Sequence, residues 1–158
     1  MMVPTPNRYA LVKGASEGEF LLNAFDYALL DAGVGDTNLV RMSSILPPHA
    51  QRVTVEEMNL PKGGLIPVAY GMITSDKPGT TISTAVSIAI PVDPSLPGVI
   101  METEGEMPLS ECEAKVRKMA EEAFKKRNRA LKEIISIGAE ITVKEVGGVF
   151  AAVVLWYE

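Results

Sequence analysis

The chain has 158 residues, and 47% of them are hydrophobic, which is enough apolar material for one domain with an ordinary core. Its single cysteine, Cys112, excludes an internal disulfide, and its net charge of −5 argues against a protein dedicated to binding nucleic acid. No apolar run reaches the about 18 residues of a membrane-spanning helix and no signal segment is evident, so we expect a soluble, cytoplasmic protein without a membrane partner.

Alternating and helical periodicities divide the chain into six or seven strands and two helices. In chain order, we expect a strand at 9–13, a helix from about 16 to 31, strands at 37–44, 66–75, 81–90 and 98–103, a helix from 110, and strands at 134–143 and 149–157. The strands cluster between the helices instead of alternating with them. This order favours an α+β layered fold over a doubly wound one.

Local patterns add detail to this outline. Ser16 and Glu19 have the spacing of a capping box, which predicts the start of the first helix. One face of the strand at 81–90 carries small residues, and we expect it to lie under a helix or at a subunit contact. Residues 144–148 join the last two strands as a candidate hairpin, whereas residues 49–64 predict irregular structure.

Two adjacent serines end the strand at 37–44. An extended apolar run leads into Ser43 and Ser44, and a rigid Pro-Pro pair follows almost at once. A serine hydroxyl can attack the carbonyl of the preceding residue and convert the amide to an ester. Elimination across Ser44 would then cleave the chain and leave a pyruvoyl ketone, which is an electron sink of the kind that cofactors supply. On the dipeptide alone, two ordinary serines at a strand end are the commoner interpretation.

The segment from Val40 to Pro48 resembles the self-cleavage site of the pyruvoyl-dependent arginine decarboxylases. The resemblance runs from about Tyr9 to the end of the chain. Its further matching segments, all in the same order, are 16–18, 22–26, 69–71, 78–79, 81–83, 98–102, 150–152 and 155–157. Because these matches are long and in the same order, they favour self-cleavage at the serine pair over two ordinary serines at a strand end.

The resemblance implies a four-layer αββα sandwich, similar to that of pyruvoyl-dependent histidine decarboxylase. It implies a single domain, 1–158, that is made as a proenzyme and cleaves itself between Ser43 and Ser44. The products would be a β chain, 1–43, and an α chain, 44–158. It also implies a trimer of cleaved protomers, with active sites at the interfaces between subunits.

The resemblance assigns the chemistry to a few residues. The ketone from Ser44 would form a Schiff base with the substrate amine and accept the electrons of decarboxylation, as pyridoxal phosphate does elsewhere. Ser43 would become the new C-terminus, and Asn38 would assist cleavage by donating to the oxyanion. The cofactor is thus a covalent pyruvoyl group, with no pyridoxal phosphate and no metal. Since His49 is the only histidine, a metal site with several histidines is excluded.

Glu102 lies in an apolar strand segment, where partial desolvation would raise its pKa as a proton donor requires. Glu104 faces the same side of that strand, and the residues alone do not separate the two. The resemblance selects Glu102 as the group that protonates the α-carbon after CO2 leaves.

The resemblance makes Asp26 the anchor of the substrate guanidinium, with Leu22 and Leu29, one turn to either side, lining the slot for the methylene stem. The implied enzyme is a carboxy-lyase that converts L-arginine to agmatine and CO2 for polyamine synthesis. Tyr27 stands where a small residue is common in the family, so the same chemistry on lysine, ornithine or histidine stays open as an alternative. Another alternative is an uncleaved scaffold subunit without catalytic activity.

Overall fold

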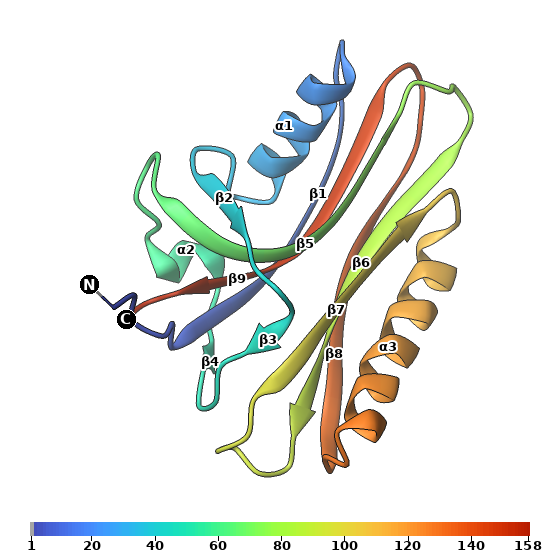
Figure 1. Cartoon of the computed structure of the whole chain (residues 1–158). Coiled ribbons are helices and arrows are strands. Elements are labelled where there is room, and N and C mark those ends of the chain that lie inside the picture. The colour runs from blue at the N-terminus through green and yellow to red at the C-terminus, as the bar shows by residue number, and fades with distance from the viewer. Residues whose placement is uncertain (1) are drawn as a thin grey trace.

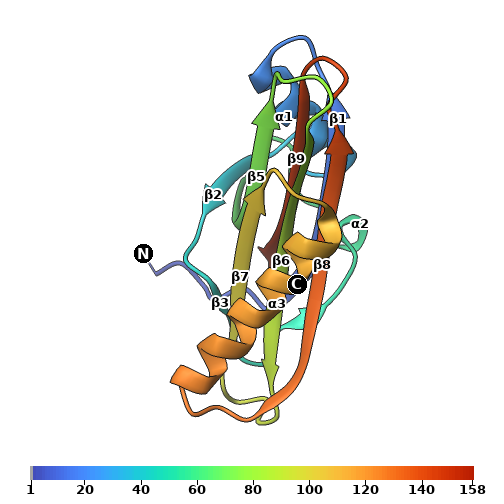
Figure 2. The same cartoon turned by 90° about the vertical axis from the view of Figure 1, so that its right-hand side faces the viewer.

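The computed structural model describes residues 2–158, and they form four layers (Figure 1). Helix α1 (Leu21–Asp31) covers one face of a five-stranded sheet, and a four-stranded sheet packs on the other face. Helix α3 (Leu109–Lys126) crosses over the outer face of the second sheet, as Figure 2 shows from that side. The predicted α+β, αββα sandwich is therefore confirmed.

The strand order is β2-β5-β9-β1-β4 in the first sheet and β3-β7-β6-β8 in the second. The strands are β1 (Arg8–Glu17), β2 (Asn38–Arg41), β3 (Ile45–Leu46), β4 (Gln51–Arg52), β5 (Leu65–Ser75), β6 (Thr81–Pro91), β7 (Gly98–Gly105), β8 (Leu131–Thr142) and β9 (Gly147–Trp156). Long antiparallel ladders join β9 to β1 and β5, and β6 to β7 and β8. The short strands β2 and β3 lie at sheet edges that face the site described below.

Apolar side chains fill the three spaces between the layers. Those between α1 and the first sheet include Leu29, Ile66, Val68 and Phe150. Those between the two sheets include Val86, Ile88, Ile100 and Val153, and those under α3 include Val99, Ala120 and Phe124. Burial of this surface is the main favourable term in folding, and it sets the two sheets against each other.

The small-residue face of β6 lies under α3, which settles the two alternatives for this strand. Ser83 Oγ donates to the Met107 carbonyl oxygen and Ser87 Oγ donates to the Val116 carbonyl oxygen, each at 2.7 Å. Small side chains let the helix approach the sheet, and the hydrogen bonds satisfy hydroxyl groups that would otherwise be buried at a cost.

The predicted capping box at Ser16 is wrong. Strand β1 continues to Glu17, with Ser16 paired to Gly148 of β9, and α1 begins only at Leu21. The Glu17 carboxylate is also engaged, since it accepts backbone N–H groups of the link between β8 and β9, the shortest at 2.6 Å. The long ladder to β9 and this carboxylate contact outweigh a local helix start.

The predicted hairpin at 144–148 is also wrong, because β8 and β9 belong to different sheets. Nearly all of β9 is buried and it has a partner on each edge, so it takes the centre of the first sheet, as its continuous apolar sequence favours. Residues 49–64, predicted as irregular, contain β4 and the short helix α2 (Val55–Met58). A capping box between Thr54 and Glu57 caps the N-terminus of α2.

Within residues 2–158, no helix has the length and apolar character needed to cross a membrane.

Candidate active site

The serine pair lies where the chain passes from one sheet to the other. The Met42 N–H donates to the Val68 carbonyl oxygen of the first sheet at 3.1 Å. Two residues later, the Ser44 carbonyl oxygen accepts the Ile100 N–H of the second sheet at 2.8 Å. The single strand predicted at 37–44 therefore ends at β2, because these bonds draw Met42 and Ser44 to different sheets, and Ser43 bridges the gap.

The carbonyl group between the two serines has a backbone donor. The Ile45 N–H donates to the Ser43 carbonyl oxygen at 3.1 Å. Ser43 is exposed and Ser44 is half-buried. A donor on this oxygen stabilises the negative charge that develops if a nucleophile attacks the carbonyl carbon.

Glu102 lies on β7 two residues beyond Ile100, whose N–H binds the Ser44 carbonyl oxygen, so Glu102 is close to the serine pair. It lies on the same face of the strand as Ile100. Its side chain is 23% exposed, and its Oε2 is buried without a hydrogen-bond partner among the described residues. Burial raises the pKa of Glu102, Arg41 opposes that increase, and Glu104 adds to it. The predicted raised pKa of Glu102 is confirmed. Glu104 is exposed. Burial therefore distinguishes Glu102 from Glu104, which the sequence alone did not do.

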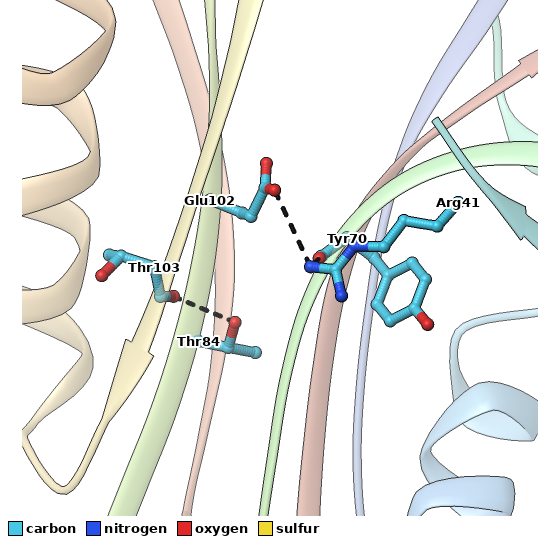
Figure 3. Close-up of polar contacts among 5 residues, drawn as sticks. All are labelled: Arg41, Tyr70, Thr84, Glu102 and Thr103. Carbon is cyan, nitrogen blue, oxygen red and sulfur yellow. Dashed lines mark hydrogen bonds and ion pairs between the residues drawn. The ribbon is translucent and has the colours of Figure 1, made fainter. Parts of the chain in front are cut away.

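Arg41, the last residue of β2, faces Glu102 across the space between the sheets (Figure 3). One guanidinium nitrogen lies 3.8 Å from Glu102 Oε1 and donates to the Tyr70 carbonyl oxygen at 2.7 Å. The guanidinium carbon also lies 4.5 Å from the centre of the Tyr70 ring, within the range of a cation–π contact. Sequence reasoning missed both residues, although a charged residue ending an apolar strand next to the serines was an available signal.

The two sheets approach closely beside Glu102. A Cβ on Gly71 of β5 would collide with Thr84 Oγ, and it would lie 3.5 Å from the Glu102 Cβ. Thr84 Oγ donates to the Thr103 carbonyl oxygen at 3.1 Å (Figure 3), so its position is fixed. Glycine at position 71 is therefore needed for the close packing that desolvates the Glu102 carboxyl group.

The other predicted site residues lie elsewhere in the protomer. Asn38 is at the far end of β2, and its Nδ2 donates to the Gly63 carbonyl oxygen at 2.9 Å. Asp26 is exposed on α1, which covers the outer face of the first sheet, whereas Glu102 faces the space between the sheets. Leu22 is 76% exposed, but Leu29 is buried in the core under α1, so the two do not form one open slot within a single protomer.

A pyruvoyl group derived from Ser44 fits these surroundings. Ser44 is half-buried, its backbone is held by Ile100, and the unpartnered Oε2 of Glu102 lies on the neighbouring strand. Among residues 2–158, no cluster of three or more His, Cys, Asp or Glu residues is placed to hold a metal ion. Cys112 is buried, its thiol donates to the Thr103 carbonyl oxygen at 3.4 Å, and burial raises its pKa, so it suits a structural role.

Comparisons with known proteins agree on one family. The family model described as pyruvoyl-dependent arginine decarboxylase matches residues 8–157. A pyruvoyl-dependent arginine decarboxylase of Methanocaldococcus jannaschii is 54% identical over 153 residues, which are 97% of this chain and 92% of that protein. One of Pyrococcus horikoshii is 42% identical over 97% of this chain and 96% of that protein. The structure of pyruvoyl-dependent histidine decarboxylase at pH 8 matches with a TM-score of 0.51 and 16% identity over 63% of this chain and 53% of that one, which concerns the fold alone.

Proposed function

This chain belongs to the pyruvoyl-dependent arginine decarboxylase family, and we propose that it cleaves itself between Ser43 and Ser44 and then decarboxylates L-arginine to agmatine and CO2. The observation that supports this most strongly is the position of the serine pair, on the link between the sheets and next to the half-buried Glu102. A cut there leaves both fragments inside one fold, because β1 of the first fragment keeps its full ladder with β9.

Self-cleavage begins with attack of Ser44 Oγ on the Ser43 carbonyl carbon. The C–N bond breaks, the Ser44 nitrogen takes the proton, and an ester joins the two serines. The Ile45 N–H is placed to stabilise the oxyanion of this step. Elimination then releases Ser43 as a carboxylate, and water replaces the Ser44 nitrogen, which leaves as ammonia.

Asn38 contributes to cleavage in this proposal by fixing the position of β2. Its amide holds the Gly63 carbonyl at the start of the strand that ends in the serine pair. Within one protomer this contact, and not a direct bond to the Ser43 oxygen, is how Asn38 can act.

The pyruvoyl group supplies a carbonyl that binds the substrate amine and accepts the electron pair released with CO2. Glu102 supplies the proton. Because burial raises the pKa of its carboxyl group, Glu102 holds a proton at neutral pH more often than an exposed glutamate does. The close approach of the sheets at Gly71 limits the access of water to the same carboxyl group, whose Oε2 is buried.

Recognition of the guanidinium by Asp26 needs a second copy of the chain. Within one protomer, Asp26 and Glu102 lie on opposite sides of the first sheet. The α1 face around Asp26 carries exposed apolar side chains, as expected of a surface that a partner covers; they are Phe20, Leu22, Tyr27 and Leu30. We therefore include in the proposal a trimer with active sites between subunits. We also propose that the protein acts in the cytoplasm and that its agmatine is used in polyamine synthesis.

The proposal is tested by comparing the purified protein with Ser44→Ala and Glu102→Gln. We expect the unmodified protein to cleave and to release CO2 and agmatine from L-arginine. Ser44→Ala should stay intact and inactive, and Glu102→Gln should cleave but decarboxylate about 10²–10⁴ times more slowly. Release of CO2 by Ser44→Ala, or a cleaved protein that acts on lysine or ornithine and not on arginine, would contradict the proposal.

A further inference from the structure

Arg41 reaches the site from the strand that leads into the serine pair (Figure 3). Its guanidinium is bound to Tyr70 by a hydrogen bond to the carbonyl oxygen and by contact with the ring. The Tyr70 ring is itself fixed, because the ring centres of Phe25 and Phe150 lie 6.5 and 5.5 Å from it. The charge of Arg41 is therefore held by a rigid aromatic cluster at 3.8 Å from Glu102.

Each contact of Arg41 crosses the proposed break. Arg41 belongs to the fragment 1–43, whereas Tyr70 and Glu102 belong to the fragment 44–158. Cleavage removes the covalent link that holds Ser43, and a new chain end gains conformational freedom. Cleavage also creates a carboxylate at Ser43, two residues from Arg41 and beside the strand that carries Glu102.

This inference rests on the proposed function and adds a residue to it. We propose that Arg41 is a positioning residue, which fastens the new end of the fragment 1–43 to the fragment 44–158 and holds the Glu102 carboxyl group in place beside the pyruvoyl end. Arg41 does not itself transfer the proton. It acts through Glu102, whose Oε1 faces the guanidinium while Oε2 stays free of hydrogen bonds.

The surroundings of Glu102 show why a cation is needed there. The charged groups that face it are Arg41 from β2 and Glu104 from its own strand, and the side chains packed on it from β5 and β6 are uncharged. Burial and Glu104 raise the pKa of Glu102, and the new Ser43 carboxylate acts in the same direction. Arg41 opposes these three effects by lowering the pKa of Glu102. The Glu102 carboxyl group can therefore release its proton during catalysis as well as hold it.

A direct test uses Ser44→Ala, which keeps the chain intact as in the structure. The carboxyl carbon of Glu102 is followed by NMR in protein labelled with carbon-13 at glutamate, and Glu102→Gln identifies its signal. In the Ser44→Ala protein, adding Arg41→Gln removes the charge, and we expect Glu102 to titrate at higher pH. Adding Arg41→Lys keeps the charge and should leave the titration near that of the parent.

Lys77→Gln is the matched control, since Lys77 pairs with Glu106 at 4.0 Å in an exposed contact away from the site. It removes the same charge from the molecule and should leave the titration of Glu102 unchanged. A Glu102 titration that Arg41→Gln does not move, or that Lys77→Gln moves equally, would overturn the positioning role.

The cleaved enzyme gives a second readout. Activity needs Glu102 protonated, so kcat falls as pH rises through its pKa; Arg41→Gln should move this fall to higher pH. Arg41→Lys should leave the fall in place but lower kcat about 10- to 100-fold, because it cannot make the same contacts with Tyr70. An equal loss of kcat at every pH in both variants would indicate structural damage only and would refute the role. If the unmodified protein neither cleaves nor decarboxylates, the proposed function fails, while the NMR result still decides whether Arg41 controls Glu102.

Discussion

The close approach of the sheets at Gly71 makes a quantitative prediction. In Gly71→Ala, the new Cβ would collide with Thr84 Oγ, which is fixed by its bond to the Thr103 carbonyl oxygen. Overpacking of this kind costs about 1–3 kcal/mol. In Thr84→Ala, loss of the hydrogen bond costs about 1 kcal/mol. If the two changes were independent, the double variant would lose the sum, about 2–4 kcal/mol.

The structure predicts that the two changes are not independent. Thr84→Ala removes the atom with which the new Cβ collides, so the double variant should lose only about 1 kcal/mol relative to the parent. Urea unfolding of all four proteins in the Ser44→Ala background, followed by fluorescence of the single tryptophan, Trp156, measures these values. The protein concentration must be equal throughout, because assembly shifts apparent stability. Additive losses would refute the collision and, with it, the close packing of the two sheets beside Glu102.

Three further predictions concern single side chains. Since the pKa of Glu102 is raised in the folded protein, ionisation of this carboxyl group costs stability at pH values above its pKa in the unfolded chain. Glu102→Gln should therefore be more stable than the parent at pH 7 and lose that advantage near pH 4. Urea unfolding of both proteins at the two pH values measures this. Asp26→Asn should raise KM for arginine more than for an uncharged amino acid in steady-state assays, and equal effects on both would remove Asp26 as the guanidinium anchor. Cys112 should react with a thiol reagent only after denaturation, because it is buried and its thiol pKa is raised; rapid labelling of the native protein would contradict this packing.

Much of the fold could be predicted from the sequence, because strong local periodicity and tertiary packing agree there. The apolar stripe of α3 and the small-residue face of β6 fit each other in the structure. The errors came where a long-range partner decides the outcome. Ser16 has the local signal of a helix cap, but the ladder to Gly148, far along the chain, overrides it. The last two strands are neighbours in sequence, but pairing of β9 on both edges separates them into two sheets.

The candidate site divides in the same way. Glu102 could be recognised because an acidic residue in an apolar strand is a local signal of desolvation, and its pKa is indeed raised. Arg41 could not be connected to it, since their contact joins β2 of the first sheet to β7 of the second and depends on the crossing at the serine pair. The roles of Asn38, Asp26, Leu22 and Leu29 stay predictions.

Self-cleavage between Ser43 and Ser44 is tested most directly by the intact mass of the purified protein under denaturing conditions. We expect two fragments, 1–43 and 44–158, with the larger one lighter by one ammonia than the same fragment beginning with serine. A single full-length mass that persists after prolonged incubation would contradict it, because no pyruvoyl group would form and the chain would then be a scaffold without catalytic activity.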